Sequence, residues 1–457
     1  MLAELSHRLN FLVGGARDLP ARQKTLRGAI DWSHDLLTSA EQRLFRRLAV
    51  FAGGSTLDAI EAVSNSEVDL DVLGTIESLV GKSLLKQTDA HGEPRFAMLE
   101  TIREYAGEKL LAAGEEERER ERHRECYLAL AEEAQAKLMG AEQTEWLQQL
   151  EDEHENLRAA LNWSLVVAEA RGGLRLCGAL QRFWATRGHL TEGRGWCARF
   201  LGRAAGEVGT LERAKALNAA GVLAQMQADY PAARTQYEES LAIRRRLGDR
   251  SGIAGSLNNL ANVCALQSDH SSARTLYEES IAIRRQLGDR SGIAVSLDNL
   301  GAVAHFQGDF ASARPLIEES LAIMRELGHH AGIADALNSL GTVVTEQSDY
   351  AGAWILHEEA LLIRRELGDV EGTARSLEGL AAVVAALGSP LRAARIWGAA
   401  ERIRAEVGLP LSPSRPDYHR RVAAARTALG DDTSFERGWQ EGRALTMEQA
   451  IELTRKK

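Results

Sequence analysis

The stretch LAIRRRLGD at residues 241–249 decides the fold, because the chain repeats it at a fixed interval. IAIRRQLGD follows at 281–289, LAIMRELG at 321–328 and LLIRRELGD at 361–369, so the period is 40 residues. A fixed period between about 20 and 50 residues is typical of a solenoid, in which each unit buries its apolar face against its neighbours. We therefore expect residues 215–408 to form an array whose function depends on a surface.

Each unit resembles a tetratricopeptide repeat. LDNLGAVA at 297–304 and ARPLI at 313–317 follow that family's W-x2-L-G-x2-Y and A-x3-F spacing, with smaller residues at two aromatic positions. HEAT-type repeats share the length, but the Leu-Gly pair and an Asp-aromatic pair such as Asp309-Phe310 favour the tetratricopeptide interpretation. The expected fold class is all-α, with a right-handed tetratricopeptide-type α-solenoid of 40-residue helix-turn-helix repeats.

The array extends beyond its regular units. GHLTEGR at 188–194 aligns with the unit 40 residues later, so 171–207 reads as a degenerate first repeat. The last repeat has Gly388-Ser389-Pro390 in place of the Asp-aromatic turn, and terminal repeats are usually atypical. We therefore assign 171–408 to the repeats and 409–457 to a helical cap.

The amino-terminal part has a different periodicity. Helical patterns from residue 21 include a third helix after a Ser55/Thr56 cap and a fourth over 69–80. Short strands at 83–87 and 95–98 flank a turn-rich segment, and a further helix follows at 100–113. This order predicts a winged-helix domain with a small β-hairpin over 21–113, and residues 1–20 read as the tail of a missing upstream domain.

Residues 114–170 are predicted to form a helical linker. The run at 114–123 is so densely charged that we expect a solvated helix with i,i+4 ion pairs, continuing to Leu138. One further helix is expected to carry the apolar residues from Trp146 to Trp163.

Composition excludes several classes of protein. The net charge of -10 argues against nonspecific binding of nucleic acid, which requires clustered Lys and Arg. Four widely spaced cysteines with no CxxC pair are typical of reduced thiols, and no apolar run is long enough to span a bilayer. We predict a soluble, cytoplasmic protein.

The sequence contains none of the catalytic motifs that we searched for. Val80-Gly81-Lys82-Ser83 resembles the end of a P-loop, but Ile76 stands where that motif requires glycine. GxSxG, HExxH and CxxC patterns do not occur. We therefore expect no enzyme activity, no metal and no cofactor in this chain.

A polar ladder marks the first helix of each repeat, which lines the concave groove in tetratricopeptide proteins. Asn amides offer both a donor and an acceptor to an extended peptide, although they can instead bond to the neighbouring repeat and only hold the stack together. The candidate partner-binding residues are Asn218, Asn258, Asn259, Asn262, Asp298, Asn299, His305, Asn338, Thr342 and Glu378.

The charged residues of the second helices have a simpler interpretation. Arg234/Glu238 and Arg314/Glu318 stand four residues apart, and an Arg pair occupies 244–245 and again 284–285. Such runs usually form a solvated outer surface. We expect no binding role for them.

The region before the repeats resembles the winged-helix part of the STAND, or NB-ARC-like, signalling ATPases. The resemblance rests on LVGKSLL at 79–85 and RFAMLETIREYA at 95–106, with upstream support from 19–33 and 45–51. It implies the carboxyl-terminal portion of a bacterial regulator whose ATPase core is absent here. Met98-Leu99-Glu100 take the place of the family's Met-His-Asp motif, so this nucleotide-sensing motif is degenerate.

The function implied is a non-catalytic sensor that binds a partner protein, a peptide or a small effector in the groove. A stand-alone scaffold without switching is the alternative. DNA binding through the winged helix is less favoured, because residues 69–80 carry Asp69, Asp71 and Glu77 and no Lys or Arg.

Overall fold

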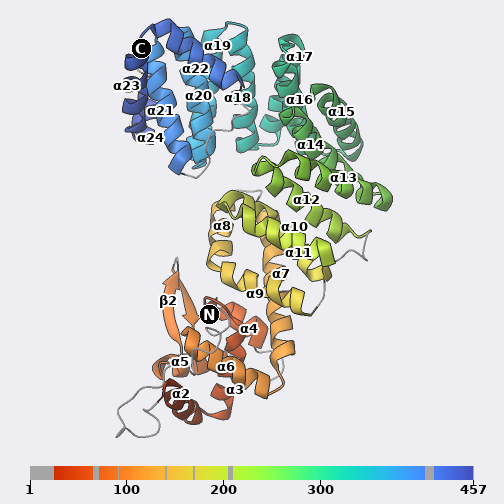
Figure 1. The fold of residues 1–457 in the computed structure, drawn as a ribbon, viewed down its shortest axis with the longest axis vertical. Coiled ribbons are helices and arrows are strands. Elements are labelled where there is room, and N and C mark those ends of the chain that lie inside the picture. The colour runs from red at the N-terminus through yellow and green to blue at the C-terminus, as the bar shows by residue number, and fades with distance from the viewer. Residues whose placement is uncertain are drawn as a thin grey trace. The chain divides into compact units, whose positions relative to one another are not determined.

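A computed structural model describes residues 25–64, 71–90, 92–138, 142–167, 170–203, 209–406 and 416–455 (Figure 1). The chain divides into two compact units, Met1–Gln227 and Ala228–Lys457. The first unit holds a small sheet and the helices around it, and the second is helical wherever it has regular secondary structure. The expected fold class is confirmed: a winged-helix domain precedes a tetratricopeptide-type α-solenoid.

The winged-helix part begins with helices that have well-formed amino-terminal caps. The Thr38 hydroxyl accepts from the Glu41 amide, and the Glu41 carboxylate accepts from the Thr38 amide at 2.7 Å, which completes a capping box. Leu44 and Phe45 on the same helix are fully buried. The helices are α2 (Leu26–Asp35), α3 (Ser39–Arg47), α4 (Leu57–Ser64), α5 (Val72–Gly81) and α6 (Glu100–Ala112), with a 3₁₀ turn at Leu48–Val50.

The predicted hairpin is confirmed, and a third strand joins it. Strand β2 (Lys86–Ala90) pairs antiparallel with β3 (Glu93–Ala97). The short strand β1 (Ser55–Thr56) pairs with the other edge of β3, which gives the order β1-β3-β2. We predicted Ser55/Thr56 only as a helix cap; Thr56 does accept from the Ala59 amide, and its backbone also extends the sheet.

The linker region corrects two predictions. Helix α7 (Glu116–Lys137) is not simply solvated, because Glu119 is fully buried and lies 3.5 Å from Arg47. The single helix expected from Trp146 to Trp163 is two helices, α8 (Gln143–Asp152) and α9 (His154–Val166). Glu153 at the break is buried and accepts a hydrogen bond from Tyr127 at 2.8 Å, so a buried charge fixes this corner.

Three more helices complete the first unit. Helices α10 (Ala170–Arg187) and α11 (Leu190–Arg203) occupy the segment predicted as a degenerate repeat, and α12 (Leu211–Met226) follows. A Cβ atom on Gly193 would lie 2.6 Å from the ring of Trp184, so only glycine permits this approach of α11 to α10. Among the described residues, no helix is long and apolar enough to cross a membrane.

The second unit is a regular stack of antiparallel helices. Each regular turn is built the same way: Asp249 accepts from the Gly252 amide at 2.9 Å, and Gly248 adopts a φ of 68° before it. His329 replaces the Asp before one helix, and its Nδ1 accepts from the Gly332 amide at 2.9 Å. The helices are α13 (Tyr230–Leu247), α14 (Arg250–Leu266), α15 (His270–Leu287), α16 (Arg290–Phe306), α17 (Phe310–Glu326), α18 (His330–Glu346), α19 (Tyr350–Glu366), α20 (Val370–Ala386) and α21 (Pro390–Glu406).

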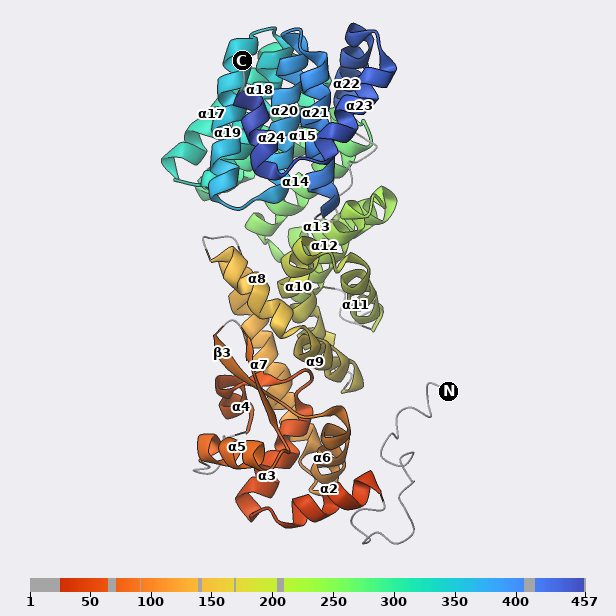
Figure 2. The same ribbon diagram turned by 90° about the vertical axis from the view of Figure 1, so that its left-hand side faces the viewer.

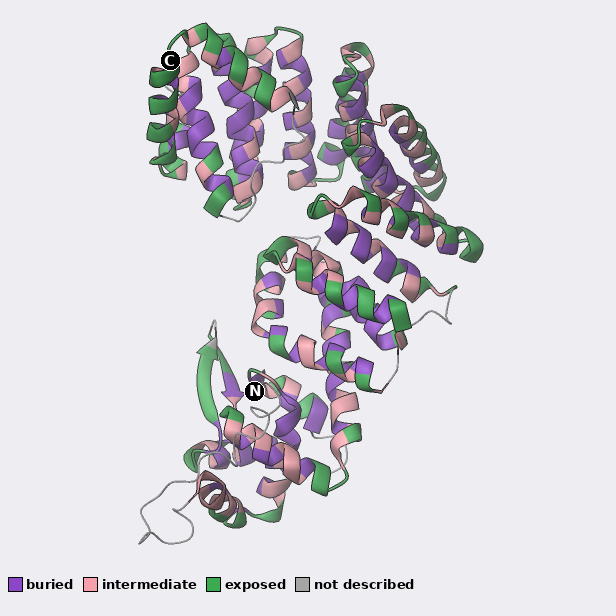
Figure 3. Cartoon of the chain, viewed as in Figure 1, coloured by how far each residue is buried: buried purple, intermediate pink, exposed green. Residues whose placement is uncertain are grey.

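Three helices close the carboxyl-terminal end: α22 (Pro416–Leu429), α23 (Asp432–Arg443) and α24 (Met447–Arg455). They pack on α20 and α21 (Figures 1 and 2). A Cβ atom on Gly398 would lie 2.0 Å from the Trp439 carbonyl oxygen, so α23 is held tightly against α21. Figure 3 shows buried residues along the facing sides of the paired helices and exposed residues on their outer sides. The residue limits that we proposed for each domain stay predictions.

Candidate functional site

One position of the 40-residue repeat distinguishes the later repeats of the second unit from the earlier ones. The position is filled in turn by Tyr237, Tyr277, Ile317, His357 and Trp397. Tyr237 and Tyr277 are buried, and the Tyr277 hydroxyl donates a hydrogen bond to Asn262 on the inner helix of its repeat. In the next two repeats, smaller side chains leave this space partly open.

A cavity of about 190 Å³ lies where Ile317 and His357 replace the tyrosines. Two glycines face the His357 ring: a Cβ atom on Gly379 would lie 2.4 Å from it and one on Gly341 2.8 Å from it. The cavity is lined on its apolar side by Ala302, Phe306, Ile317, Val343, Ala382, Trp397 and Tyr418, and on its polar side by His305, Asp335, Asn338, Ser339, Thr342, His357, Arg375, Glu378, Asp417 and Arg421.

The hydrogen bonds of His357 fix its tautomer. Asn338 donates through Nδ2 to the Ser376 hydroxyl at 2.9 Å, so its Oδ1 is the acceptor for His357 Nδ1 at 3.1 Å. His357 Nε2 is buried and has no hydrogen-bond partner among the described residues. Burial lowers the pKa of His357 to about 3, so the ring is neutral and Nε2 is a free acceptor.

Helix α22 supplies one wall of the cavity. His305 Nδ1 lies 3.7 Å from the Asp417 carboxylate, and Arg421 donates to Glu346 at 2.6 Å. His305 Nε2 is buried without a hydrogen-bond partner in the part of the chain that the structure describes. Burial lowers the pKa of His305, so this ring also favours the neutral form.

The charged residues of the wall are already paired. Glu378 accepts two hydrogen bonds from Arg404, at 2.7 and 3.1 Å. Arg375 lies 3.2 Å from Asp335, and Arg420 lies 3.1 Å from Asp417. A charged ligand would therefore have to compete with existing ion pairs, whereas a neutral one would not.

The structure brings four of the predicted partner-binding residues to this cavity: His305, Asn338, Thr342 and Glu378. Asn338 and Glu378 also bond within the stack, and Asn258 accepts from Ser296 of the next repeat at 3.0 Å. These three side chains are 5 to 7% exposed. Asn258 and Asn338 are therefore bonded to serine side chains of the neighbouring repeat, whereas Glu378 is paired with Arg404 of its own repeat.

The remaining ladder residues lie elsewhere. Asp298 accepts from Ser339 at 3.1 Å, and burial together with the negative charge of Asp335 raises its pKa to about 7. Asn259, Asn262 and Asn299 are half-buried on α14 and α16, and the half-buried Asn218 belongs to α12 of the first unit. A partner-binding role for these residues stays a prediction.

Two motifs of the winged-helix part were singled out in the sequence, and the interpretation of Met98-Leu99-Glu100 as a degenerate nucleotide-sensing motif stays a prediction. Met98 is half-buried and Leu99 exposed just before α6, and Glu100 pairs with Arg103 at 2.7 Å. Lys82 follows α5 and pairs with Glu41; this hydrogen bond is the main reason that the pKa of Glu41 falls to about 2. The P-loop-like tetrapeptide therefore contains a lysine engaged in a structural ion pair.

Sequence reasoning missed His357, Trp397, Tyr418 and Arg421. The first two could have been found by asking where a repeat departs from its own pattern, since tyrosine gives way to isoleucine, histidine and tryptophan at one position. The α22 residues carry no such signal, because they follow the last repeat.

Two family descriptions match the chain. The tetratricopeptide repeat model matches residues 212–286 and 292–353, and the winged helix-turn-helix domain model matches residues 37–111. Both matches fall on the parts of the chain where the sequence predicted these folds.

Among curated relatives, a protein of Mycobacterium tuberculosis named as an HTH-type transcriptional regulator is 40% identical over 258 residues. The match covers 54% of this chain and 29% of the relative, so the chain matches less than a third of that protein's length. An uncharacterized protein of the same organism is 36% identical over 118 residues, which cover 25% of this chain and 30% of the relative.

A solved structure has a similar fold. The STAND protein with a tetratricopeptide repeat sensor from Pyrococcus horikoshii is 14% identical with a TM-score of 0.50, covering 94% of this chain and 65% of that one. The chain thus contains a winged helix-turn-helix domain followed by tetratricopeptide repeats, and its fold is similar to that of a STAND protein with a tetratricopeptide repeat sensor.

Proposed function

We propose that this chain is the non-catalytic sensor region of a STAND-type regulator and that a small neutral effector binds in the cavity of its second unit. The order of domains and the likeness to an HTH-type regulator support the regulatory part of this proposal. The single observation that carries the binding part is the cavity beside His357.

The walls of the cavity define the chemistry of the effector. Phe306, Trp397 and Tyr418 offer aromatic surface, and His357 Nε2 offers an acceptor with no present partner. A buried acceptor left unpaired costs about 1–3 kcal/mol, so a ligand that donates to it gains that amount relative to one that does not. The best-fitting class is a compact, partly aromatic molecule with a hydroxyl or N–H donor.

The size of the cavity is consistent with this class. A dry engineered cavity of about 150 Å³ holds benzene, so a space of about 190 Å³ accommodates a single six-membered ring with a polar substituent. A long peptide does not fit this part of the groove, because α22 already covers it. Peptide or protein partners would bind elsewhere on the concave face.

Helix α22 is the element that we expect to respond. Ala425 is the one described residue of α22 that is buried, whereas α23 is fixed through the close approach at Gly398. An effector shifts a conformational equilibrium only if it binds one state better than the other. Contact with Tyr418 and Arg421 would make effector binding depend on the position of α22.

We do not place the function in DNA binding. Helix α5 precedes the hairpin, the position of a recognition helix, and its sequence VLGTIESLVG contains one acidic residue and no basic one. Phosphate contacts depend mostly on Lys and Arg. The match to a winged helix-turn-helix family therefore supports the fold of this part. We assign the proposed sensing role to the repeats.

Phenol is a suitable probe because it combines one ring with one hydroxyl donor. Isothermal titration calorimetry should detect one-to-one binding with a Kd of about 1 mM or tighter. Fluorobenzene, which lacks the donor, should bind about tenfold more weakly because His357 Nε2 stays unpaired. The variant His357→Tyr should bind neither compound, because it places at position 357 the larger side chain that Tyr277 has at the equivalent position.

The control is Tyr277→Phe, which removes a hydroxyl two repeats away and should leave phenol binding unchanged. Equal binding of phenol by the wild type and His357→Tyr, or no saturable binding by the wild type, would contradict the proposal. Circular dichroism on each variant separates loss of the cavity from loss of the fold.

A further inference from the structure

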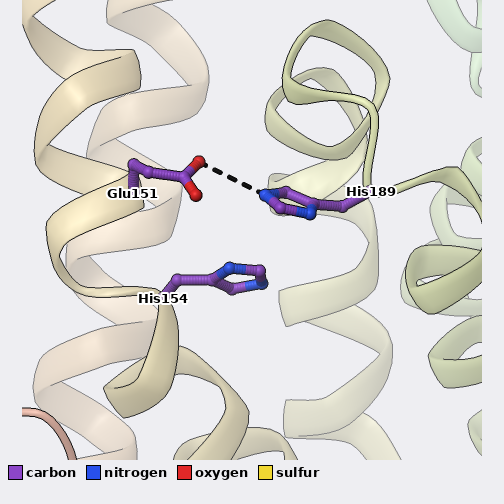
Figure 4. Close-up of side chains that lie close together, drawn as sticks. All are labelled: Glu151, His154 and His189. Atoms are coloured by element: carbon purple, nitrogen blue, oxygen red, sulfur yellow. Dashed lines mark hydrogen bonds and ion pairs between the residues drawn. The ribbon is translucent and has the colours of Figure 1, made fainter.

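Three potential metal ligands meet in the first unit, at the corner between α8 and α9 and the turn before α11. Glu151 lies in the last turn of α8, His154 is the first residue of α9, and His189 follows Gly188 in the α10–α11 turn (Figure 4). One ligand atom from each residue lies within 4.8 Å of the other two. Residues distant in sequence therefore form one compact cluster of two imidazoles and a carboxylate.

The spacing of these atoms is close to that of a tetrahedral ion. Metal–ligand bonds of about 2.0–2.1 Å place neighbouring ligand atoms roughly 3.3–3.4 Å apart. His189 Nε2 and Glu151 Oε2 are 3.2 Å apart, and the centroids of the His154 and His189 rings are 4.3 Å apart. Small side-chain rotations would bring the third atom to the same spacing without moving the helices.

His154 provides an independent observation. The residue is 7% exposed, and its Nε2 has no hydrogen-bond partner among the described residues. The Glu192 carboxylate lies 3.3 Å from this nitrogen but does not form a hydrogen bond with it, and two arms of Arg158 hold that carboxylate. A buried imidazole nitrogen that has no hydrogen-bond partner can bind an ion through its lone pair.

The surrounding charges favour a cation only moderately. Glu151 and Glu192 are negative, while Arg158 neutralises Glu192 and Arg187 lies 3.9 Å from Glu151. An ion that binds through imidazole nitrogen depends less on net charge than one that binds through oxygen alone. Two imidazoles select zinc-class ions over magnesium and calcium, which prefer all-oxygen sites.

We propose that Glu151, His154 and His189 bind one divalent transition-metal ion of the zinc class, with water as the fourth ligand. The ion joins the α8–α9 corner to the α10–α11 turn within the first unit. It stabilises the packing of the first, degenerate repeat on the helices that precede it. Glu192 stays with Arg158 and contributes negative charge beside the site.

The test uses the full chain without a polyhistidine tag, stripped of metal with a chelator and titrated with Zn²⁺ against a chromogenic competitor. We expect one ion per chain by elemental analysis and a rise in Tm when Zn²⁺ is added. Loss of even an outer-shell partner weakens metal sites by about 10- to 100-fold, so removing a ligand should weaken binding at least that much.

The variants His189→Gln and Glu151→Gln remove partly exposed ligands with little change in volume, so both should fold. His330→Gln is the matched control, because His330 is exposed and lies in the second unit. Binding of Co²⁺ should give the visible absorption of a tetrahedral site in the wild type and the control, and not in the two variants. Zn²⁺ binding of equal affinity in the wild type and His189→Gln, or no stoichiometric binding by the wild type, would overturn the proposal.

Discussion

The repeat at α14–α15 and the repeat at α18–α19 share one framework and differ at its centre. In the first, Tyr277 is buried in the same apolar cluster as Ala261 and donates a hydrogen bond to Asn262. In the second, His357 lies between Gly341 and Gly379 and leaves a cavity. The comparison shows that a solenoid can form a cavity by changing a few repeated positions while its helices keep their arrangement.

A second position shows the same divergence. Asn258 and Asn338 bond to serines of the following repeat, whereas Glu378, 40 residues after Asn338, forms a buried ion pair with Arg404. At this position the regular repeats therefore use neutral hydrogen bonds to the next repeat, and the last repeat uses an ion pair between its own two helices. Substitutions at equivalent positions should consequently lower the free energy of unfolding by different amounts.

The largest loss of stability is expected for Arg404→Met. It removes the guanidinium that pairs with the buried Glu378 carboxylate, and breaking a buried ion pair typically costs about 3–5 kcal/mol. Chemical denaturation of the second unit's helices, followed by circular dichroism, measures this change. The double variant Arg404→Met/Glu378→Gln should recover most of the loss; no recovery would indicate that packing of the Arg404 side chain matters more than its charge.

The next largest effect is expected for Asp298→Asn, and it depends on pH. The pKa of Asp298 is about 7 in the folded chain and near 4 in the unfolded one, so the folded state binds more protons between these values. The stability contributed by this group therefore falls as pH rises from about 4 to about 7. The variant should match the wild type at pH 4 and exceed it by up to about 4 kcal/mol at pH 8.

Urea denaturation at several pH values measures that difference. The control is Asp335→Asn, which removes the nearby negative charge and should lower the pKa of Asp298. A constant difference in stability between Asp298→Asn and the wild type across pH 4 to 8 would show that the Asp298 carboxylate does not cause the pH dependence.

A smaller loss is expected for Asn258→Ala, about 1 kcal/mol. The change removes the neutral acceptor of the Ser296 hydroxyl, a typical hydrogen-bond contribution. The double variant Asn258→Ala/Ser296→Ala should cost little more than the single one, because both remove the same bond. Additive costs would mean that the two side chains stabilise the stack through separate contacts.

The smallest effect is expected for the two adjacent arginines near the end of α15, which differ in exposure. Arg284 packs under the turn and pairs with Asp289 at 3.0 Å, while Arg285 is exposed and lies 3.3 Å from Glu319 of the next repeat. Arg285→Ala should change stability by less than about 0.5 kcal/mol and Arg284→Ala by more. Equal changes in Tm for the two variants would contradict this distinction. The structure corrects our prediction that the whole Arg pair is simply solvated.

Much of the fold could be predicted from sequence, because the 40-residue period, the Asp caps and the glycine stops are local signals. The break between α8 and α9 could not, since it depends on where buried Glu153 meets Tyr127 across the fold. The short strand β1 was missed because Ser55-Thr56 also satisfies a helix cap.

The candidate site was less predictable than the fold. The ladder of Asn258, Asn338 and Glu378 follows from the repeat, but the hydrogen bonds that its members form depend on the packing of neighbouring helices. His154 and His189 lie 35 positions apart in the sequence, with no spacing that indicates a metal site. Their proximity results from tertiary packing alone.

Hydrogen–deuterium exchange with and without saturating phenol tests the central claim most directly. Binding beside His357 should slow amide exchange in α22 and in the adjoining parts of α18 and α20, and leave α14 and α15 unchanged. The same experiment on His357→Tyr should show no difference between the two conditions. Unchanged exchange in α22 of the wild type at saturation, or equal slowing throughout the second unit, would contradict the account.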